Sequence, residues 1–81
     1  MKARDRVVQI IQDVAFENGN ERLKDIDITD DMNLMSGLGL DSFMLAQITV
    51  HIENEFGVDI FESGIVNNVS EIQKKLSDNV D

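Results

Sequence analysis

The sequence predicts an all-α protein, a small antiparallel helical bundle with three substantial helices, one short helix before the last, and a long first loop. Apolar residues recur at helical spacing in three separate segments. The one stretch with strand-like alternation has no second strand to pair with. The 81 residues suffice for a single domain over residues 1–81, built around one small core.

The first helix is indicated by apolar residues at i, i+3, i+4, i+7 and i+8, which share one helix face. These residues are Val7, Ile10, Ile11, Val14 and Ala15. The sequence Asn18-Gly19-Asn20 follows, and Gly19 suits the left-handed conformation that commonly ends a helix. We therefore expect the first helix to end just before Gly19.

Residues 21–41 keep no helical period and are predicted to be the long loop. Residues 25–29 alternate between polar and apolar, and we interpret them as an extended segment whose Ile26 and Ile28 pack into the core. Long loops in compact domains are usually functional or disordered. Three leucines argue against disorder, because they are spaced as anchors to the core: Leu34, Leu38 and Leu40.

The second substantial helix is predicted to begin at Asp41-Ser42 and to end at Gly57. Asp41 and Ser42 are both good N-cap residues, so the sequence leaves the choice between them open. The apolar stripe that defines the buried face consists of Leu45, Ile48, Ile52 and Phe56.

The last helix is predicted from a capping box, in which Asn68 is followed three residues later by Glu71. Its apolar stripe consists of Val69, Ile72 and Leu76, and Val80 would extend it. A short helix over residues 62–67 is expected to precede it.

The negative charge of the chain limits the kinds of partner that it can bind. Seven Lys and Arg stand against sixteen Asp and Glu, giving a net charge of −9, and residues 25–73 contain no Lys or Arg. Such a chain is repelled by nucleic acids and anionic membranes, and a basic partner surface complements it. No apolar run approaches a membrane span, and no secretory pattern is present. We expect a cytoplasmic monomer without membrane insertion.

The sequence contains no complete motif for catalysis or metal binding. The absence of Cys excludes disulfides and a thiol nucleophile. The Asp-rich segment lacks the Gly and Glu that a calcium loop requires. Ser42 lacks the flanking glycines of a nucleophile elbow. His51 would lie on the opposite face of the same helix, about 13 Å along its axis. We predict no catalytic residue and no metal site, and therefore a binding or carrying module.

Ser42 stands where the long loop turns into a helix. A phosphate attached to its hydroxyl would meet free backbone N–H groups and the positive end of the helix dipole. The simpler interpretation, that Ser42 or Asp41 only caps the helix, explains the same residues. Residues 29–42, which end in Gly39-Leu40-Asp41-Ser42, closely resemble the attachment site of acyl carrier proteins and related phosphopantetheine-carrying domains. The resemblance extends over nearly all of the chain.

The resemblance implies a four-helix bundle in which Ser42, preceded by Asp41, is the attachment point. A phosphopantetheinyl transferase would move 4′-phosphopantetheine from coenzyme A onto its hydroxyl. The thiol of that cofactor would then carry acyl groups as thioesters, which explains how a chain without Cys could take part in thiol chemistry. The cargo would lie in an acyl-chain pocket, and the residues that could line it, or form plain core, are Ile60, Phe61 and Ile65.

In that family the second helix binds basic patches on acyl-loading and acyl-processing enzymes. Asp41 and Glu53 match acidic positions of this surface. The surface is otherwise more apolar and less charged than in fatty-acid carriers, because it has Phe43, Met44 and Gln47. We therefore expect a specialised lipid or secondary-metabolite pathway, such as polyketide synthesis, rather than bulk fatty acid synthesis. The alternatives are an aminoacyl or peptidyl carrier and an unmodified adaptor of the same fold.

Overall fold

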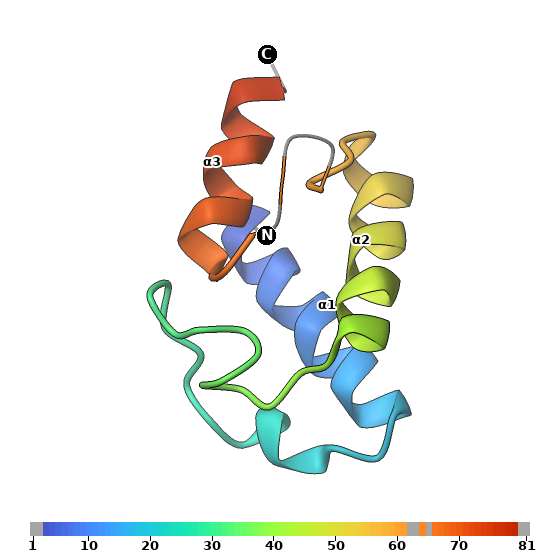
Figure 1. The fold of residues 1–81 in the computed structure, drawn as a ribbon, viewed down its shortest axis with the longest axis vertical. Coiled ribbons are helices and arrows are strands. Elements are labelled where there is room, and N and C mark those ends of the chain that lie inside the picture. The colour runs from blue at the N-terminus through green and yellow to red at the C-terminus, as the bar shows by residue number, and fades with distance from the viewer. Residues whose placement is uncertain (1–2, 62–63, 65, 80–81) are drawn as a thin grey trace.

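The protein is all-helical in the part described by the computed structural model, which comprises residues 3–61, 64 and 66–79, without the side chains of 78 and 79. These residues form α1 (Ala3–Glu17), a 3₁₀-helix η1 (Glu21–Lys24), α2 (Ser42–Phe56) and α3 (Val69–Asn79), and no strand. In Figure 1, α1 lies between α2 and α3, and the long loop folds beneath them. The prediction of an all-α fold with a long first loop is confirmed, whereas η1 was not predicted.

The short helix predicted over residues 62–67 falls largely outside the described residues, since 62, 63 and 65 are not described. The neighbours that are described, Gly64, Val66 and Asn67, are not helical. The described part of the chain therefore contains three α-helices.

The core is organised around α1, which contacts η1, α2 and α3. The five apolar residues predicted to share its buried face are all buried, with at most 3 % of each exposed. The predicted stripes of the other helices also join the core, with one exception. The buried members are Leu45, Ile48, Ile52, Val69, Ile72 and Leu76. Val80, which was predicted to extend the last stripe, lies outside the described residues.

The exception is Phe56, which the period predicts to be buried and which the structure shows to be only half-buried. Phe56 is the last residue of α2, and Gly57 directly after it takes the left-handed conformation with φ 72°. The helix ends there, so the outer side of the Phe56 ring is not covered by a further turn and lines a cavity instead.

The ends of the helices follow the predicted signals. Gly19 has φ 89°, and the Asn20 N–H donates to Ala15 O at 2.8 Å, which closes α1. Asn68 Oδ1 accepts from the Glu71 N–H at 2.9 Å, as a capping box requires. Glu71 Oε2 accepts in return from the N–H of Asn67 at 3.1 Å.

The long loop is anchored by apolar side chains and by backbone hydrogen bonds. All three predicted leucine anchors are buried, and so is Ile28. The prediction for Ile26 is wrong, because 38 % of that residue is exposed. The chain bends at Asp25 and Ile26 just after η1, so the alternation that would place both isoleucines on one side is interrupted.

Two arginines at the start of α1 form hydrogen bonds with the long loop and with α2. Arg4 donates to Asp30 Oδ1 at 2.5 Å and to Ile28 O at 2.7 Å in the long loop. Arg6 donates to Glu55 Oε2 at 2.5 Å at the end of α2. That hydrogen bond lowers the pKa of the Glu55 carboxyl and raises the pKa of Arg6.

Candidate functional site

Ser42 is the first residue of α2, and it is exposed. Asp41, in extended conformation (φ −108°, ψ 177°), is the N-cap, and its Oδ1 accepts from the Met44 N–H at 2.8 Å. The sequence left open which of the two residues caps α2, and the structure assigns this role to Asp41. Within the described part of the chain no hydrogen bond engages the Ser42 hydroxyl. Its oxygen is therefore free to react.

A tight turn centred on Asn33 fixes the loop that leads to Ser42. Asn33 Oδ1 accepts from the N–H groups of Met35 and Ser36, both at 2.9 Å. Asn33 O accepts from Gly37 at 2.9 Å and from Leu38 at 3.0 Å. A Cβ atom on Gly37 would lie 2.7 Å from Asn33 O, so any other residue at this position would force the backbone of the turn to shift.

The chain then returns to the core before α2 begins. Leu40 donates its N–H to Leu34 O at 3.1 Å, and both side chains are buried. Gly39, between the turn and Leu40, has φ 76°, a backbone conformation that residues other than glycine rarely adopt. The buried leucines and Gly39 together set the direction in which the chain enters α2, and so the position of Ser42.

The backbone at Ser42 suits a phosphate group. The N–H groups of Ser42 and Phe43 belong to the first turn of α2 and have no acceptor inside the helix. The Asp41 carboxylate occupies the N–H of Met44, two residues further on, and leaves these two free. Together with the positive end of the dipole they favour an anion on the Ser42 oxygen. Residues 25–73 contain no Lys or Arg, so no basic side chain of that stretch adds to this attraction.

A cavity of about 300 Å³ opens beside Ser42, lined by Met35, Ser42, Leu45, Ala46 and Phe61. Apart from the Ser42 hydroxyl its side chains are apolar. Of the residues predicted to line an acyl pocket, Phe61 is in this wall. Ile60 is 1 % exposed and belongs to the core, and Ile65 lies outside the described residues.

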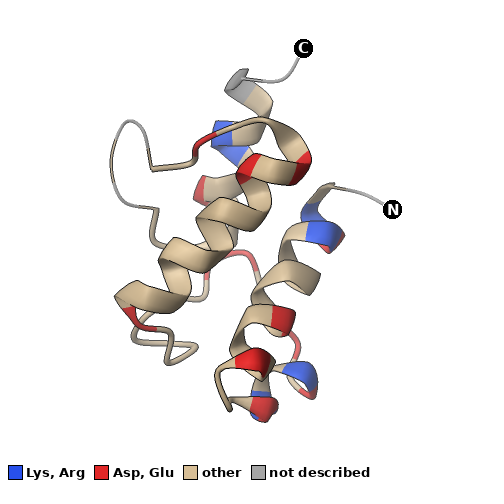
Figure 2. Cartoon of the chain, turned by 90° about the vertical axis from the view of Figure 1, so that its right-hand side faces the viewer, with Lys and Arg blue, Asp and Glu red and all other residues tan. Residues whose placement is uncertain are grey.

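The outward face of α2 is apolar along its middle. Phe43 is 64 % exposed and Val50 is 56 % exposed, and with Ala46, Gln47 and His51 they line a hollow of about 280 Å³. Figure 2 shows acidic residues only at the two ends of this helix. Val50 was missed in the sequence, although its position seven residues after Phe43 places both on one face.

The predicted partner residues do not all lie on this face. Asp41, Phe43 and Glu53 are exposed. Met44 is half-buried and packs against the core. Gln47 is half-buried, and its Oε1 accepts a hydrogen bond from Asn18 Nδ2 at 2.8 Å.

A family model described as phosphopantetheine attachment site matches residues 5–73 of this chain. The chain belongs to this family. Family members carry a covalently attached 4′-phosphopantetheine and act as non-catalytic carriers. They interact in general with a phosphopantetheinyl transferase and with acyl-processing enzymes. No curated protein and no solved structure matches the chain.

Membership of the phosphopantetheine attachment site family confirms the resemblance drawn from residues 29–42. The cofactor of the family supplies a thiol, the one nucleophile that a chain without Cys lacks. Among the described residues no cluster of three or more His, Asp or Glu side chains could hold a metal ion. None of the described helices combines the length and the apolar composition needed to cross a bilayer.

Proposed function

We propose that this chain bears its 4′-phosphopantetheine on Ser42 and presents thioester-bound acyl groups to partner enzymes, with no catalytic residue of its own. The observation that carries the proposal is the free, exposed hydroxyl of Ser42 at the start of α2, with Asp41 as the cap. A separate transferase would join the Ser42 oxygen to phosphorus, and the adenosine bisphosphate part of coenzyme A would leave. The thiol of the attached group holds the cargo as a thioester.

The cavity beside Ser42 favours acyl over aminoacyl cargo. Met35, Leu45 and Phe61 line it, and no charged side chain does. An apolar chain loses water contact there at no electrostatic cost. The ammonium group of an aminoacyl cargo would find no partner and would have to keep its hydration outside. In this proposal Phe61 forms a wall of the acyl-chain pocket, Ile60 belongs to the core, and Ile65 is a further lining residue.

The outward face of α2 is the surface that we propose for partner enzymes. Phe43 and Val50 provide an apolar centre, and Asp41 and Glu53 place negative charge toward its two ends. A partner with an apolar hollow and a basic rim complements this pattern. Desolvated apolar contacts contribute most to affinity, while rim charges mainly steer the encounter.

Met44 and Gln47 are half-buried beside this surface, and each would make a smaller contact with the partner enzyme than Phe43 does. The middle of the surface is apolar and carries little charge, so it suits partner enzymes whose docking sites are matched to it. Such dedicated enzymes are expected in a specialised lipid or secondary-metabolite pathway. The protein would act there as a cytoplasmic monomer.

Attachment is tested by intact-protein mass spectrometry after incubation with coenzyme A and a transferase of broad specificity. The wild type should gain the mass of one phosphopantetheine group. Ser42→Ala should gain nothing, and Ser36→Ala, a matched control at an exposed serine of the preceding loop, should gain as the wild type does. An unmodified wild type would favour the adaptor function, and modified Ser42→Ala would place the arm elsewhere.

The cargo preference is tested by loading octanoyl and alanyl groups onto the arm and measuring thermal unfolding. Octanoyl should raise the midpoint relative to the unacylated form, because its chain is buried next to Phe61. Alanyl should leave the midpoint unchanged. A rise with alanyl that equals the rise with octanoyl would favour the aminoacyl carrier.

The partner surface is tested through the same transferase reaction. Phe43→Ser should lower kcat/KM by roughly tenfold or more, the loss expected for an apolar anchor. Phe16→Ser is the control, because Phe16 is another exposed aromatic residue and lies on α1. Equal losses in the two variants would show that the α2 face has no special role in docking.

A further inference from the structure

Two apolar hollows lie along α2, and Ala46 lines both of them. The cavity beside Ser42 has a volume of about 300 Å³, and the hollow on the outward face, which Phe43 and Val50 line, has about 280 Å³. Ala46 is exposed, and its side chain is a single methyl group. Only a low ridge therefore separates the two hollows, and they meet at Ala46.

Ser42, Ala46 and Val50 follow one another along a single row of α2. Positions four residues apart are separated by about 6 Å along the helix axis and are rotated by about 40°. The row thus runs from the proposed attachment point over Ala46 to Val50. Residues 42–52 contain no Asp, Glu, Lys or Arg, so no such charge interrupts the row.

Exposed apolar side chains gather around this row. Five large apolar side chains are exposed in the described part of the chain, and three of them line the two hollows: Met35, Phe43 and Val50. Contact between such side chains and water is unfavourable, and a hydrocarbon that covers them removes it. The row is therefore a suitable path for an apolar chain.

The cavity beside Ser42 limits how much hydrocarbon it can hold. An apolar cavity of about 150 Å³ holds benzene, so a cavity of twice that volume holds about ten to twelve heavy atoms. An octanoyl group is smaller than this limit, and a tetradecanoyl group is larger. Leu45, the buried residue of the lining, is part of the core with Ile48 and Ile52, so a longer chain would have to separate packed side chains to continue inward.

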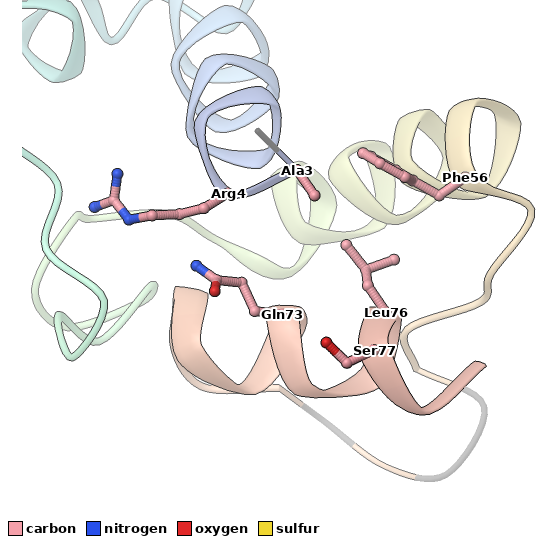
Figure 3. A pocket seen from close by; sticks show the side chains of 6 residues that line it. All are labelled: Ala3, Arg4, Phe56, Gln73, Leu76 and Ser77. Atoms are coloured by element: carbon pink, nitrogen blue, oxygen red, sulfur yellow. The ribbon is translucent and has the colours of Figure 1, made fainter. Parts of the chain in front are cut away.

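A further cavity, of about 310 Å³, lies at the opposite end of α2 and does not extend the first one. It opens where the start of α1, the end of α2 and α3 meet (Figure 3), and its lining residues are Ala3, Arg4, Phe56, Gln73, Leu76 and Ser77. Ser42 and Phe56 are the first and last residues of α2, about 21 Å apart along the helix. Among the described residues none lines both cavities, whereas Ala46 joins the Ser42 cavity to the outward hollow.

We propose that Ala46 determines where long cargo lies: an acyl chain too long for the cavity beside Ser42 crosses Ala46 and lies in the hollow beside Val50. This inference rests on the proposed attachment of phosphopantetheine to Ser42. The end of such a chain covers part of the surface proposed for partner enzymes. The length of the cargo therefore changes the surface that those enzymes contact.

The placement is tested by NMR on ¹³C-methyl-labelled protein that carries an octanoyl or a tetradecanoyl group on its arm, each form checked by intact-protein mass spectrometry. Compared with the unacylated arm, octanoyl should leave the methyl signals of Val50 unchanged. Tetradecanoyl should shift them and should give nuclear Overhauser contacts between the chain and these methyl groups. The methyl signals of Ile48 and Ile52, which report on the core, should be the same in the two acylated forms.

A variant at the ridge tests the role of Ala46. Ala46→Gln places a longer, polar side chain between the two hollows and should abolish the response of Val50 to tetradecanoyl. Glutamine is a good helix former, so α2 is retained. Ala3→Gln makes the same replacement at an exposed position of α1 and should respond as the wild type does.

Three results obtained with protein of the correct acylated mass would overturn this inference alone. They are the absence of a Val50 response to tetradecanoyl, shifts of Ile48 and Ile52 in its place, and a wild-type response in Ala46→Gln. A wild-type chain that gains no arm in the mass spectrum would overturn the proposed attachment together with this inference.

Discussion

The side-chain amide of Asn18 donates a hydrogen bond to Gln47 Oε1 at 2.8 Å and thereby joins the end of α1 to the middle of α2. The same Asn18 Nδ2 also donates to Val14 O at 2.8 Å, so the amide is held by its own helix. Gln47 was predicted from the sequence as a partner contact. Because its oxygen is engaged within the chain, a partner would meet its NH₂ group, which can only donate.

We expect Gln47→Ala to lower the free energy of unfolding by about 0.5–1.5 kcal/mol, since one hydrogen bond between two helices is lost. Urea denaturation of Gln47→Ala, Asn18→Ala and the double variant measures the coupling between the two side chains. The double variant should lose less than the sum of the single losses. Asn54→Ala, at an exposed position of α2, is the control and should change stability little. Strictly additive losses would show that the hydrogen bond contributes nothing in solution.

The turn before Ser42 gives a second prediction. In Gly37→Ala the new Cβ would lie 2.7 Å from Asn33 O, a backbone atom that cannot move without opening the turn. We expect a loss of about 1–3 kcal/mol, in the range of other forced contacts in packed positions. Because the turn positions Ser42, the rate of modification by the transferase should also fall.

The control for Gly37→Ala is Ser36→Ala, which changes the neighbouring exposed residue and leaves the backbone hydrogen bonds of the turn in place. Ser36→Ala should keep both wild-type stability and the wild-type rate. A Gly37→Ala protein with unchanged urea midpoint would mean that the turn around Asn33 relaxes freely.

The ion pair between Arg6 and Glu55 predicts a pH dependence. The hydrogen bond from Arg6 lowers the pKa of Glu55 in the folded state, so the unfolded state binds more protons in the acidic range. The stabilisation is complete above the unfolded pKa of about 4.3 and is lost as the pH falls through the lower, folded value. Wild type should therefore be more stable than Glu55→Gln at neutral pH, and the difference should disappear in acid.

Denaturation of both proteins at a series of pH values measures this difference. About 1 M salt should reduce it at neutral pH, because the pair is on the surface and is screened. A difference that stays constant from neutral pH to about pH 3 would attribute the effect of Glu55→Gln to something other than the charge.

The helices could be predicted because their signals are local. The stripe from Val7 to Ala15 and the capping box from Asn68 to Glu71 each lie within a few residues of sequence, and both hold in the structure. The burial of the loop leucines could also be predicted, because isolated apolar residues in a polar loop usually pack into the core.

The remaining features depend on contacts between distant segments. Alternation placed Ile26 in the core, but the chain bends after η1, and η1 is a short helix without a clear period. The sequence offered Asp41 and Ser42 equally as caps, and only the conformation of Asp41 decides between them. Met35 reaches the Ser42 cavity through the turn at Asn33, a relationship that no spacing in the sequence reveals.

Phe56 and Ile52 belong to one stripe in the sequence but should differ in their contributions to stability. Ile52 is 0 % exposed, so Ile52→Ala leaves a closed void and should cost about 2–5 kcal/mol. Phe56 is half-buried and lines an open cavity, so Phe56→Ala enlarges a space that solvent already reaches. Only part of the transfer free energy of the ring is lost, about 1–2 kcal/mol. Urea denaturation measures the free energy of unfolding of the two variants. A larger loss for Phe56→Ala than for Ile52→Ala would mean that the Phe56 ring is covered in solution and that the cavity beside Gln73 is closed.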